Sequence, residues 1–263
     1  MAPLRLIACF VRASFQEEAA YRANFGISLL SSLLNLTTGV LGVMVLFGQV
    51  ESVHGWNMPS TLALLGVYLI VCALRGLFIG PGLESLAGMD GEIWSGTFDF
   101  TLIRPVNTQF LVSVRKWQLF SLLDLLLGSG VLGVAVLQLH ATLTAWQVLS
   151  FVLALLAGIS ILYAILLAFA ALVFRSPGVL FTWMFDGVFQ LARYPLRMYP
   201  GWLQLVLTWV VPVGVITTLP AEALTATLNP QSLVAVLVLA AALTAGASLL
   251  FRHGLRRYTS ASS

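Results

Sequence analysis

This sequence contains few charged residues. Asp, Glu, Lys and Arg make up 9% of its 263 residues, whereas a soluble domain carries about 25%. Hydrophobic residues make up 59%, and the mean hydropathy is +0.97. A soluble fold of this length could not hide so much apolar surface, because a single core leaves much of the surface facing water. The composition therefore excludes an ordinary soluble domain and predicts that lipid surrounds most of the chain.

Motifs for nucleotide, metal or nucleophile chemistry are also missing from the sequence. There is no G-x-x-x-x-G-K-[ST] loop, and Lys116 is the single lysine. The three histidines stand apart, without H-E-x-x-H or paired-cysteine spacing, and no G-x-S-x-G accompanies the serines. We therefore expect no catalytic residue, no metal site, no cofactor and no ATPase activity of the chain's own. The pI of about 9.1 reflects the placement of Arg beside membrane spans and does not indicate nucleic acid.

Long apolar runs are what the sequence does contain. A membrane span needs about 20 mostly apolar residues to cross roughly 30 Å of hydrocarbon. Runs that meet this need cover residues 25–47, 60–80, 119–137, 146–174 and 232–251. Two shorter runs cover 179–191 and 202–219, and Pro212 interrupts the second. The predicted fold is an all-α integral membrane protein.

The orientation of these spans follows from the positions of Arg and Lys. Basic residues precede the first span, separate the second from the third, follow the fourth and end the chain, whereas loops 49–59 and 138–144 have none. Both termini are therefore expected in the cytoplasm, and six crossings fit if 179–192 crosses outward and 200–220 dips in and returns. Arg193 and Arg197 then lie at or near the outer side. No signal peptide is expected, and Cys9 and Cys72 are predicted to be free thiols.

We expect one transmembrane domain with three special segments: an interfacial helix over 1–24, a cytoplasmic loop over 81–116 and a re-entrant outer segment over 193–230. In the first, apolar and polar positions separate at helical spacing. One side carries Ile7, Phe10, Val11 and Ser14, and the other carries Arg5, Arg12 and Gln16. Such a helix rests in the membrane interface. It is either an anchor for the first span or a lever that links cytoplasmic events to that span.

The cytoplasmic loop is unusually rich in acidic and aromatic residues. Pro81 and Gly82 are expected to break the preceding helix, and tight Gly and Pro punctuation predicts short helices with fixed turns. Its acidic residues are Glu84, Asp90, Glu92 and Asp99, and Arg104 follows them. Trp94, Phe98 and Phe100 are expected to be exposed among these charges, which is typical of a docking surface. The alternative is an amphipathic loop that lies against lipid headgroups.

Three charged residues, Arg75, Asp124 and Asp186, fall within the predicted spans, and Arg193 lies just beyond one of them. An ionisable group in hydrocarbon costs on the order of 3 kcal/mol to insert. Arg75 and Asp124 lie toward the inner ends of spans two and three and could pair with each other. Asp186 and Arg193 are seven residues apart, two turns on one helix face, so they too could interact. We favour structural pairing over substrate binding for each of them.

Prolines predict irregular backbone in the outer segment. They are Pro195, Pro200, Pro212 and Pro220. Irregular backbone persists at membrane depth when protein shields it or when it lines a cavity. Residues 193–220 are therefore the candidate for an outer gate.

Two stretches of the sequence resemble a known family. Glu92-Ile93-x-x-Gly96-x-Phe98-Asp99-x-x-Leu102-x-Arg104-Pro105 is similar to the E-I-x-x-G-x-L-D-x-x-L-x-R-P signature of a bacterial branch of ABC-2 type exporter permeases. The one departure is Phe98 in place of Leu. Later prolines match the pattern before that family's last span, in Arg193-Tyr194-Pro195, Tyr199-Pro200, Pro212-Val213 and Pro220-Ala221-Glu222-Ala223-Leu224. The resemblance covers nearly the whole chain.

The resemblance implies a permease subunit of the bacterial inner membrane that pairs with a second permease, either a copy of itself or a paralogue. Two ATPase subunits would bind the cytoplasmic face, where residues 84–104 would form the coupling element. Asp99 and Arg104 would brace its turn, and the aromatic residues would fill a groove of the ATPase. Two other functions remain open from the residues alone: a secondary transporter or channel, and a membrane scaffold. A partner with ATPase motifs discriminates among the three.

Overall fold

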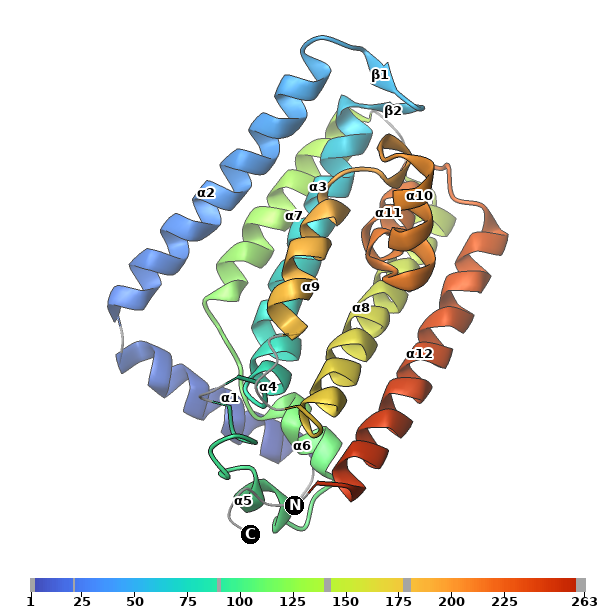
Figure 1. The fold of residues 1–263 in the computed structure, drawn as a ribbon. Coiled ribbons are helices and arrows are strands. Elements are labelled where there is room, and N and C mark those ends of the chain that lie inside the picture. The colour runs from blue at the N-terminus through green and yellow to red at the C-terminus, as the bar shows by residue number, and fades with distance from the viewer. Residues whose placement is uncertain (1–2, 21, 89–90, 140–142, 177–180, 259–263) are drawn as a thin grey trace.

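The computed structural model describes residues 3–20, 22–88, 91–139, 143–176 and 181–258 (Figure 1). Within these residues, five helices are long and apolar enough to span a membrane, or up to six if one bent pair counts as a span. The five contain α2 (Arg22–Phe47), α3 (Met58–Leu74), α7 (Ser121–Gln138), α8 (Ala145–Val173) and α12 (Pro230–Arg256). This confirms the predicted all-α membrane fold and the five long spans, with ends that differ by a few residues.

The two ends of this bundle differ in structure. We call the end formed by α1 (Pro3–Ala20), the connection between α4 (Gly80–Glu84) and α7, and the last turn of α12 the loop end (Figure 1). The opposite end is called the hairpin end, because β1 (Ser52–Val53) and β2 (Trp56–Asn57) pair there as an antiparallel hairpin. His54 and Gly55 turn that hairpin with positive φ angles of 49° and 84°, as a two-residue turn of this type requires.

Helices that start at the hairpin end have sequence-encoded caps. Asn57 accepts a hydrogen bond from the Ser60 amide, and Thr144 accepts one from the Gln147 amide, each within a capping box. Asn229 caps α12, in front of a proline in its first turn. Such side chains satisfy amide groups that a helix start leaves without partners. The caps therefore fix where the chain turns back into the membrane.

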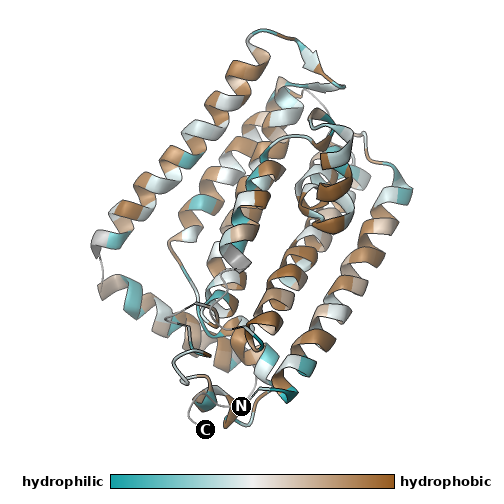
Figure 2. Cartoon of the chain, in the orientation of Figure 1, coloured by the Kyte–Doolittle hydropathy of each residue, from teal (hydrophilic) through white to brown (hydrophobic). Residues whose placement is uncertain are grey.

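Hydrophobic residues recur along the outer helices of the bundle as well as along the central ones (Figure 2). On α2, Ile27 is 65% exposed and Val45 is 71% exposed, whereas almost every residue of α3 is buried. Apolar exposure along whole helices is what a lipid environment permits. The helix α3 is therefore the centre of the bundle, and α2 is a lipid-facing helix.

Glycines allow the central helices to approach closely. A Cβ atom at Gly66 of α3 would lie 2.8 Å from the backbone nitrogen of Leu132 in α7. A Cβ atom at Gly158 of α8 would lie 2.7 Å from the backbone oxygen of Ile216. Small residues at helix contacts are typical of membrane bundles, where packing replaces the hydrophobic effect as the driving force.

The helix of the second span continues past Pro81, so the expected break at Pro81 and Gly82 was wrong. A π-helical turn, η1 (Arg75–Ile79), joins α3 to α4, and the three together form a helix from Met58 to Glu84. Pro81 lies in the first turn of α4, where the wider π-turn before it accommodates a residue without an N–H group. Glu84 therefore belongs to the end of the span and not to the loop.

A short helix returns the chain toward the hairpin end after α8. In α9 (Phe181–Phe189), Phe185 lies beside Arg75, and Phe189 stacks on Tyr68, so α9 runs antiparallel to α3. It continues into η2 (Gln190–Arg193). Together, α9 and η2 form a helical segment that is shorter than the five long spans. Because this segment runs back toward the hairpin end, α1 and the end of α12 lie at the same end of the bundle (Figure 1).

The segment that was predicted to be re-entrant, for which we keep the name re-entrant segment, follows as a chain of short elements in the half of the bundle nearest the hairpin end (Figure 1). They are η3 (Leu196–Met198), α10 (Gly201–Leu205), η4 (Val206–Val210) and α11 (Val213–Leu224). A bend of 94° separates Gly201–Val210 from Val213–Leu224. The Thr217 hydroxyl of α11 donates a hydrogen bond of 2.8 Å to the Ala192 carbonyl, which ties the segment to η2.

Candidate functional site

The loop between α4 and α7 is braced by a buried ion pair. The Arg115 guanidinium lies 2.5 Å from the Glu92 carboxylate, and their side chains are only 11% and 18% exposed. Arg115 also donates to the hydroxyl groups of Ser85 and Thr101, each at 3.1 Å. Charge-assisted bonds of this kind are stronger than neutral ones. Glu92 was predicted as part of the coupling element, and the ion pair now shows how it holds the loop together.

Sequence reasoning missed the role of Arg115, together with its partners Ser85 and Thr101. The signal was present, because Arg115 and Lys116 form a basic pair that follows the acidic part of the same loop. Lys116 also lies near Glu92, with its Nζ atom 3.4 Å from the carboxylate. What the sequence could not tell is that α6 (Thr108–Val114) turns the chain back, so that residues more than 20 apart meet.

Phe98 is the apolar centre of the loop and is completely buried. Its ring lies 5.4 Å from the ring of Phe174, at the end of α8, and 5.5 Å from that of Tyr258, just after α12. The expectation that Phe98 is exposed was therefore wrong. The physical reason is that the Phe98 amide donates to the Glu92 carbonyl, a turn that directs the ring toward the bundle. Phe98 thus attaches the loop to α8 and α12.

Asp99 and Arg104 were expected to brace the same turn. Asp99 begins α5 (Asp99–Leu102), where an acidic side chain favours the start of a helix. Burial first, and the nearby Asp99 carboxylate second, raise the pKa of Tyr258. Arg104 is exposed, and its carbonyl accepts a hydrogen bond of 2.8 Å from the Val106 amide. A bracing role for these two side chains stays a prediction.

Several large apolar side chains of the loop point away from the bundle. The most exposed are Ile103 at 78%, Phe100 at 67% and Trp94 at 54%. We call this group the loop apolar residues; it comprises Trp94, Phe100, Leu102, Ile103 and Val106. They lie beyond the end of α4, outside the long spans. Exposed apolar residues on a rigid support are typical of a surface that binds protein or lipid. Asp90, also predicted for this surface, lies outside the described residues.

Glu84 belongs to a charge cluster inside the bundle. Arg75, in the π-turn, lies 2.7 Å from the Glu84 carboxylate and also forms an ion pair with Asp186 of α9. The guanidinium carbon of Arg75 is 5.7 Å from the centre of the Phe185 ring. The Arg75 side chain is only 14% exposed, and its charge is tolerated there because two carboxylates that are themselves 38% and 42% exposed pair with it.

This cluster replaces both of the pairings considered from the sequence. There, Arg75 could have paired with Asp124, and Asp186 with Arg193, but in the structure Arg75 forms its ion pair with Asp186. The continuous helix brings Glu84 close to Arg75, and the antiparallel α9 brings Asp186 beside it. Asp124 lies in the first turn of α7, where a helix start stabilises a carboxylate without needing an arginine.

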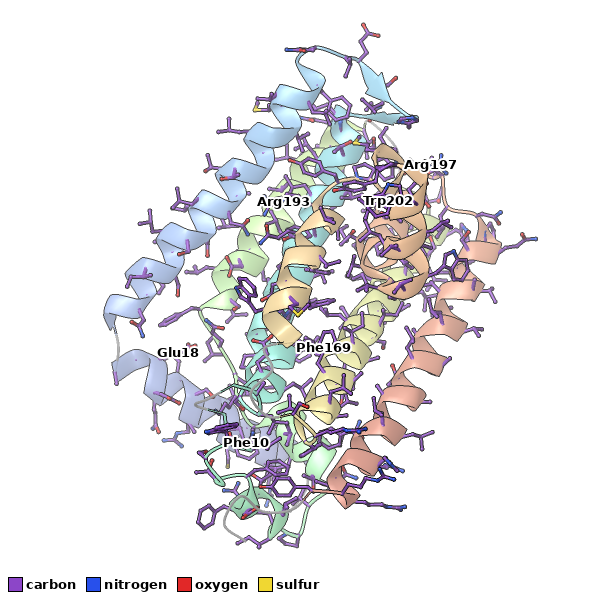
Figure 3. The ribbon with its side chains drawn as sticks, viewed as in Figure 1. Phe10, Glu18, Phe169, Arg193, Arg197 and Trp202 are labelled. Carbon is purple, nitrogen blue, oxygen red and sulfur yellow. The ribbon has the colours of Figure 1, made fainter. Side chains whose placement is uncertain are left out.

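Arg193 lies about halfway along the central helix, not at the outer surface as expected. Its guanidinium donates to the Asn35 side chain of α2 at 2.5 Å and lies 5.3 Å from the centre of the Tyr68 ring. Tyr68 is ten residues after the start of α3, which is about 15 Å along the helix axis. Asn35 likewise falls in the middle of α2. Figure 3 shows Arg193 between these helices. Arg193 therefore connects the lipid-facing α2 to the bundle.

The remaining predicted outer residues lie where the backbone changes direction. Pro200 precedes α10, and Pro212 precedes α11 at the bend. The loosest ion pair of the segment joins Arg197 to Glu222 at 4.0 Å. The predicted irregular backbone is thus present. A gating role for Pro200, Pro212 and Arg193 stays a prediction.

Comparison with known protein families gives a match that covers most of the chain. Residues 33–262 match the family described as ABC-2 family transporter protein. The chain belongs to the ABC-2 transporter family. No curated protein and no solved structure matched it in the corresponding comparisons. Together with its apolar helices, this membership makes the ABC-2 protein a multi-pass membrane component of an ABC transporter.

The family match begins inside α2, so α1 lies outside it. In the structure, Ile7, Phe10 and Val11 face inward with the buried Ser14, and the residues predicted for the polar side, Arg5, Arg12 and Gln16, are exposed. The Ser14 hydroxyl accepts a hydrogen bond from the Trp117 amide, and Glu18 accepts one from the Leu119 amide at 2.9 Å. The two sides of the helix differ in exposure as the pattern predicts, and the inward side contacts the residues just before α7. The position of this helix in the membrane interface stays a prediction.

The ABC-2 protein shows no metal-binding cluster in the part of the chain that the structure describes. Cys9 and Cys72 are free thiols, as expected from the sequence. The contacts described above among these residues are ion pairs, hydrogen bonds and aromatic contacts.

Proposed function

We propose that this ABC-2 protein is the permease subunit of an ATP-driven exporter of the bacterial inner membrane. Both of its termini lie in the cytoplasm, and a second permease, a copy or a paralogue, completes the membrane domain. Two separate ATPase subunits bind the loop end and supply the energy, while membrane lipids surround the spans. The observation that carries the proposal is the loop between α4 and α7, which is braced from within and apolar on its outer side.

A rigid loop is what force transmission requires. Glu92 and Arg115 hold it together, and Phe98 fastens it to the ends of α8 and α12. Just above it, Arg75 connects the end of the second span to α9. When ATP closes a pair of bound ATPases, the displacement of the loop would pass to these helices as a whole, in the manner of a rigid-body transition.

The loop apolar residues supply the docking surface in this proposal. Trp94, Phe100 and Ile103 lie exposed beyond the spans, and aromatic residues are enriched at the centres of protein interfaces. Asp99 and Arg104 would contribute at its edge, with Glu84 behind it in the charge cluster. Without a phosphate-binding loop of its own, the chain needs a partner to use ATP.

The test is co-purification of the tagged chain from its native membranes in mild detergent. A soluble subunit with a phosphate-binding loop is expected at a stoichiometric amount. The double variant Trp94→Ala and Phe100→Ala should lose it, since an interface residue that carries binding costs about 2 kcal/mol or more when truncated. Trp202→Ala is the matched control, because Trp202 is 67% exposed on the re-entrant segment, far from the loop (Figure 3).

Recovery of the chain without such a subunit would contradict ATP-driven transport. Copurifying membrane proteins alone would favour a scaffold, and export that persists without any ATPase would favour a secondary transporter. Retention of the ATPase by the double variant would move the docking site away from the loop apolar residues.

A further inference from the structure

A large open cavity lies between the re-entrant segment and α12. Its volume is about 760 Å³, which is within the range of small-molecule sites. The walls are mostly aliphatic and come from α11 on one side and α12 on the other. The short elements before α11 close a third side with Leu196, Gln204, Thr208 and Trp209.

Polarity changes along the length of this cavity in the same direction on both helices. On α12, Ser232 lies near the hairpin end, followed along one face by Val236, Leu239 and Ala242. From Ser232 to Ala242 is ten residues, or about 15 Å of helix. On α11, Glu222 lies toward the hairpin end, and Val215 lies about two turns deeper. The cavity therefore has a polar mouth and an apolar interior.

The charges at the mouth are only loosely satisfied. Arg197 is 66% exposed along its side chain and lies 4.0 Å from Glu222, beyond hydrogen-bond distance. The same pair also lines a smaller cavity, of about 180 Å³, on the side of the β1–β2 hairpin. Arg197 thus faces both the apolar cavity and the polar end of the molecule, and it keeps donors available for an anion.

The wall contains one further polar group without a partner. Thr218 lines the cavity and is 6% exposed, and its hydroxyl has no hydrogen-bond partner within the described part of the chain. Buried polar groups are normally hydrogen-bonded. The hydroxyl oxygen is itself buried, so Thr218 is an unsatisfied polar group within the wall of α11 and adds no contact to a bound molecule.

We infer that this cavity binds one amphiphile with an anionic headgroup. The headgroup lies at Arg197, where a guanidinium pairs with phosphate or carboxylate oxygens. The apolar chain lies along Val236, Leu239 and Ala242 toward the middle of the bundle. A membrane lipid oriented with its headgroup toward the hairpin end has this same distribution of polarity. The inference goes beyond the proposed function, because binding here requires no ATPase.

Photo-cross-linking of the purified chain in nanodiscs tests the inference. The probe is phosphatidylglycerol with a photoactivatable diazirine in its acyl chain, compared with a neutral diacylglycerol that carries the same chain. Mass spectrometry should find phosphatidylglycerol cross-links concentrated in residues 204–222 and 232–242, several-fold above those of the neutral probe. Ala242→Trp should fill the cavity and remove these cross-links. Ala241→Trp is the matched control, since Ala241 is exposed on the same helix and does not line the cavity.

A substitution of Arg197 tests whether this residue binds the headgroup. Arg197→Gln should reduce labelling by phosphatidylglycerol to the level of the neutral probe, whereas Arg175→Gln, an exposed arginine at the loop end, should leave it unchanged. Equal labelling by the two probes in the wild-type chain would overturn the anionic headgroup. Even labelling of all lipid-facing helices would overturn the site. Cross-links between two copies of the chain at these residues would also overturn it, because a second permease would then cover the cavity.

Discussion

The loop end and the re-entrant segment both consist of short helices and turns, but they are held in different ways. The loop end is fastened by a buried ion pair and by a fully buried aromatic ring. The re-entrant segment is fastened by a threonine hydroxyl on a carbonyl, by close helix packing at Gly158 and by a loose ion pair. In the proposed function, strong and specific contacts would suit the loop as a part that transmits force as one body. Weaker contacts would suit the outer segment if it changes shape as a gate.

Of the substitutions that test this difference between the two regions, removal of the Phe98 ring should cause the largest loss of stability. A fully buried Phe→Ala substitution costs about 3–5 kcal/mol, and Phe98 contacts Phe174 and Tyr258. In Phe98→Ala, hydrogen exchange should show lost protection over the loop and unchanged protection over 213–224. Phe98→Leu, the residue of the family signature, should cost less than about 1.5 kcal/mol. An unprotected loop in both variants would mean that the ring shape itself, and not apolar burial, holds the loop.

The second test compares two arginines, one at each end. Arg115→Gln removes the closer of the two cations that pair with the mostly buried Glu92 and leaves only Lys116, at 3.4 Å, so we expect a cost of about 2–3 kcal/mol. Arg197→Gln should cost about 1 kcal/mol or less, because its partner is 4.0 Å away and the arginine is exposed. Thermal unfolding of the purified chain in one detergent measures both. Equal shifts in the two variants would remove the proposed difference between the ends.

The smallest expected effect concerns α1 and pH. Burial raises the pKa of Glu18, although its hydrogen bonds to backbone amides, including that of Leu119, oppose the shift. For an acid with a raised folded-state pKa, the stabilising contribution is full below the ordinary value near 4.5 and is lost as the pH rises through the folded-state pKa. The contact between α1 and the start of α7 should therefore tighten slightly as the pH falls toward 4.5.

Spin labels on α1 and near residue 118 measure that contact as a distance distribution. Glu18→Gln should remove the pH dependence, and Glu17→Gln, the exposed neighbour, should keep most of it. A pH dependence that survives Glu18→Gln would assign it to another group.

The long spans and α1 were predictable because they depend on local composition and periodicity. A run of about 20 apolar residues crosses a membrane whatever its neighbours are, so α2, α7, α8 and α12 came close to the expected bounds. The π-turn at Arg75–Ile79 was not predictable, since a proline ordinarily signals a helix end. The prediction that Phe98 is exposed was wrong for a related reason: the position of a residue in a loop does not tell which side of a turn faces the bundle.

By itself, the sequence determined three things about this protein: that it is a membrane protein, which residues form most of its spans, and which family it resembles. The first two follow from residue types counted along the chain, whereas the family was indicated by the resemblance of ordered motifs and is shown by the match over residues 33–262. Only the tertiary structure decided that Arg75 pairs with Glu84 and Asp186, that Arg115 holds Glu92, and that Arg193 reaches the middle of α2. Ion pairs between distant residues depend on how helices cross and turn, and the cost of an unpaired charge in lipid selects among arrangements that the sequence leaves equivalent.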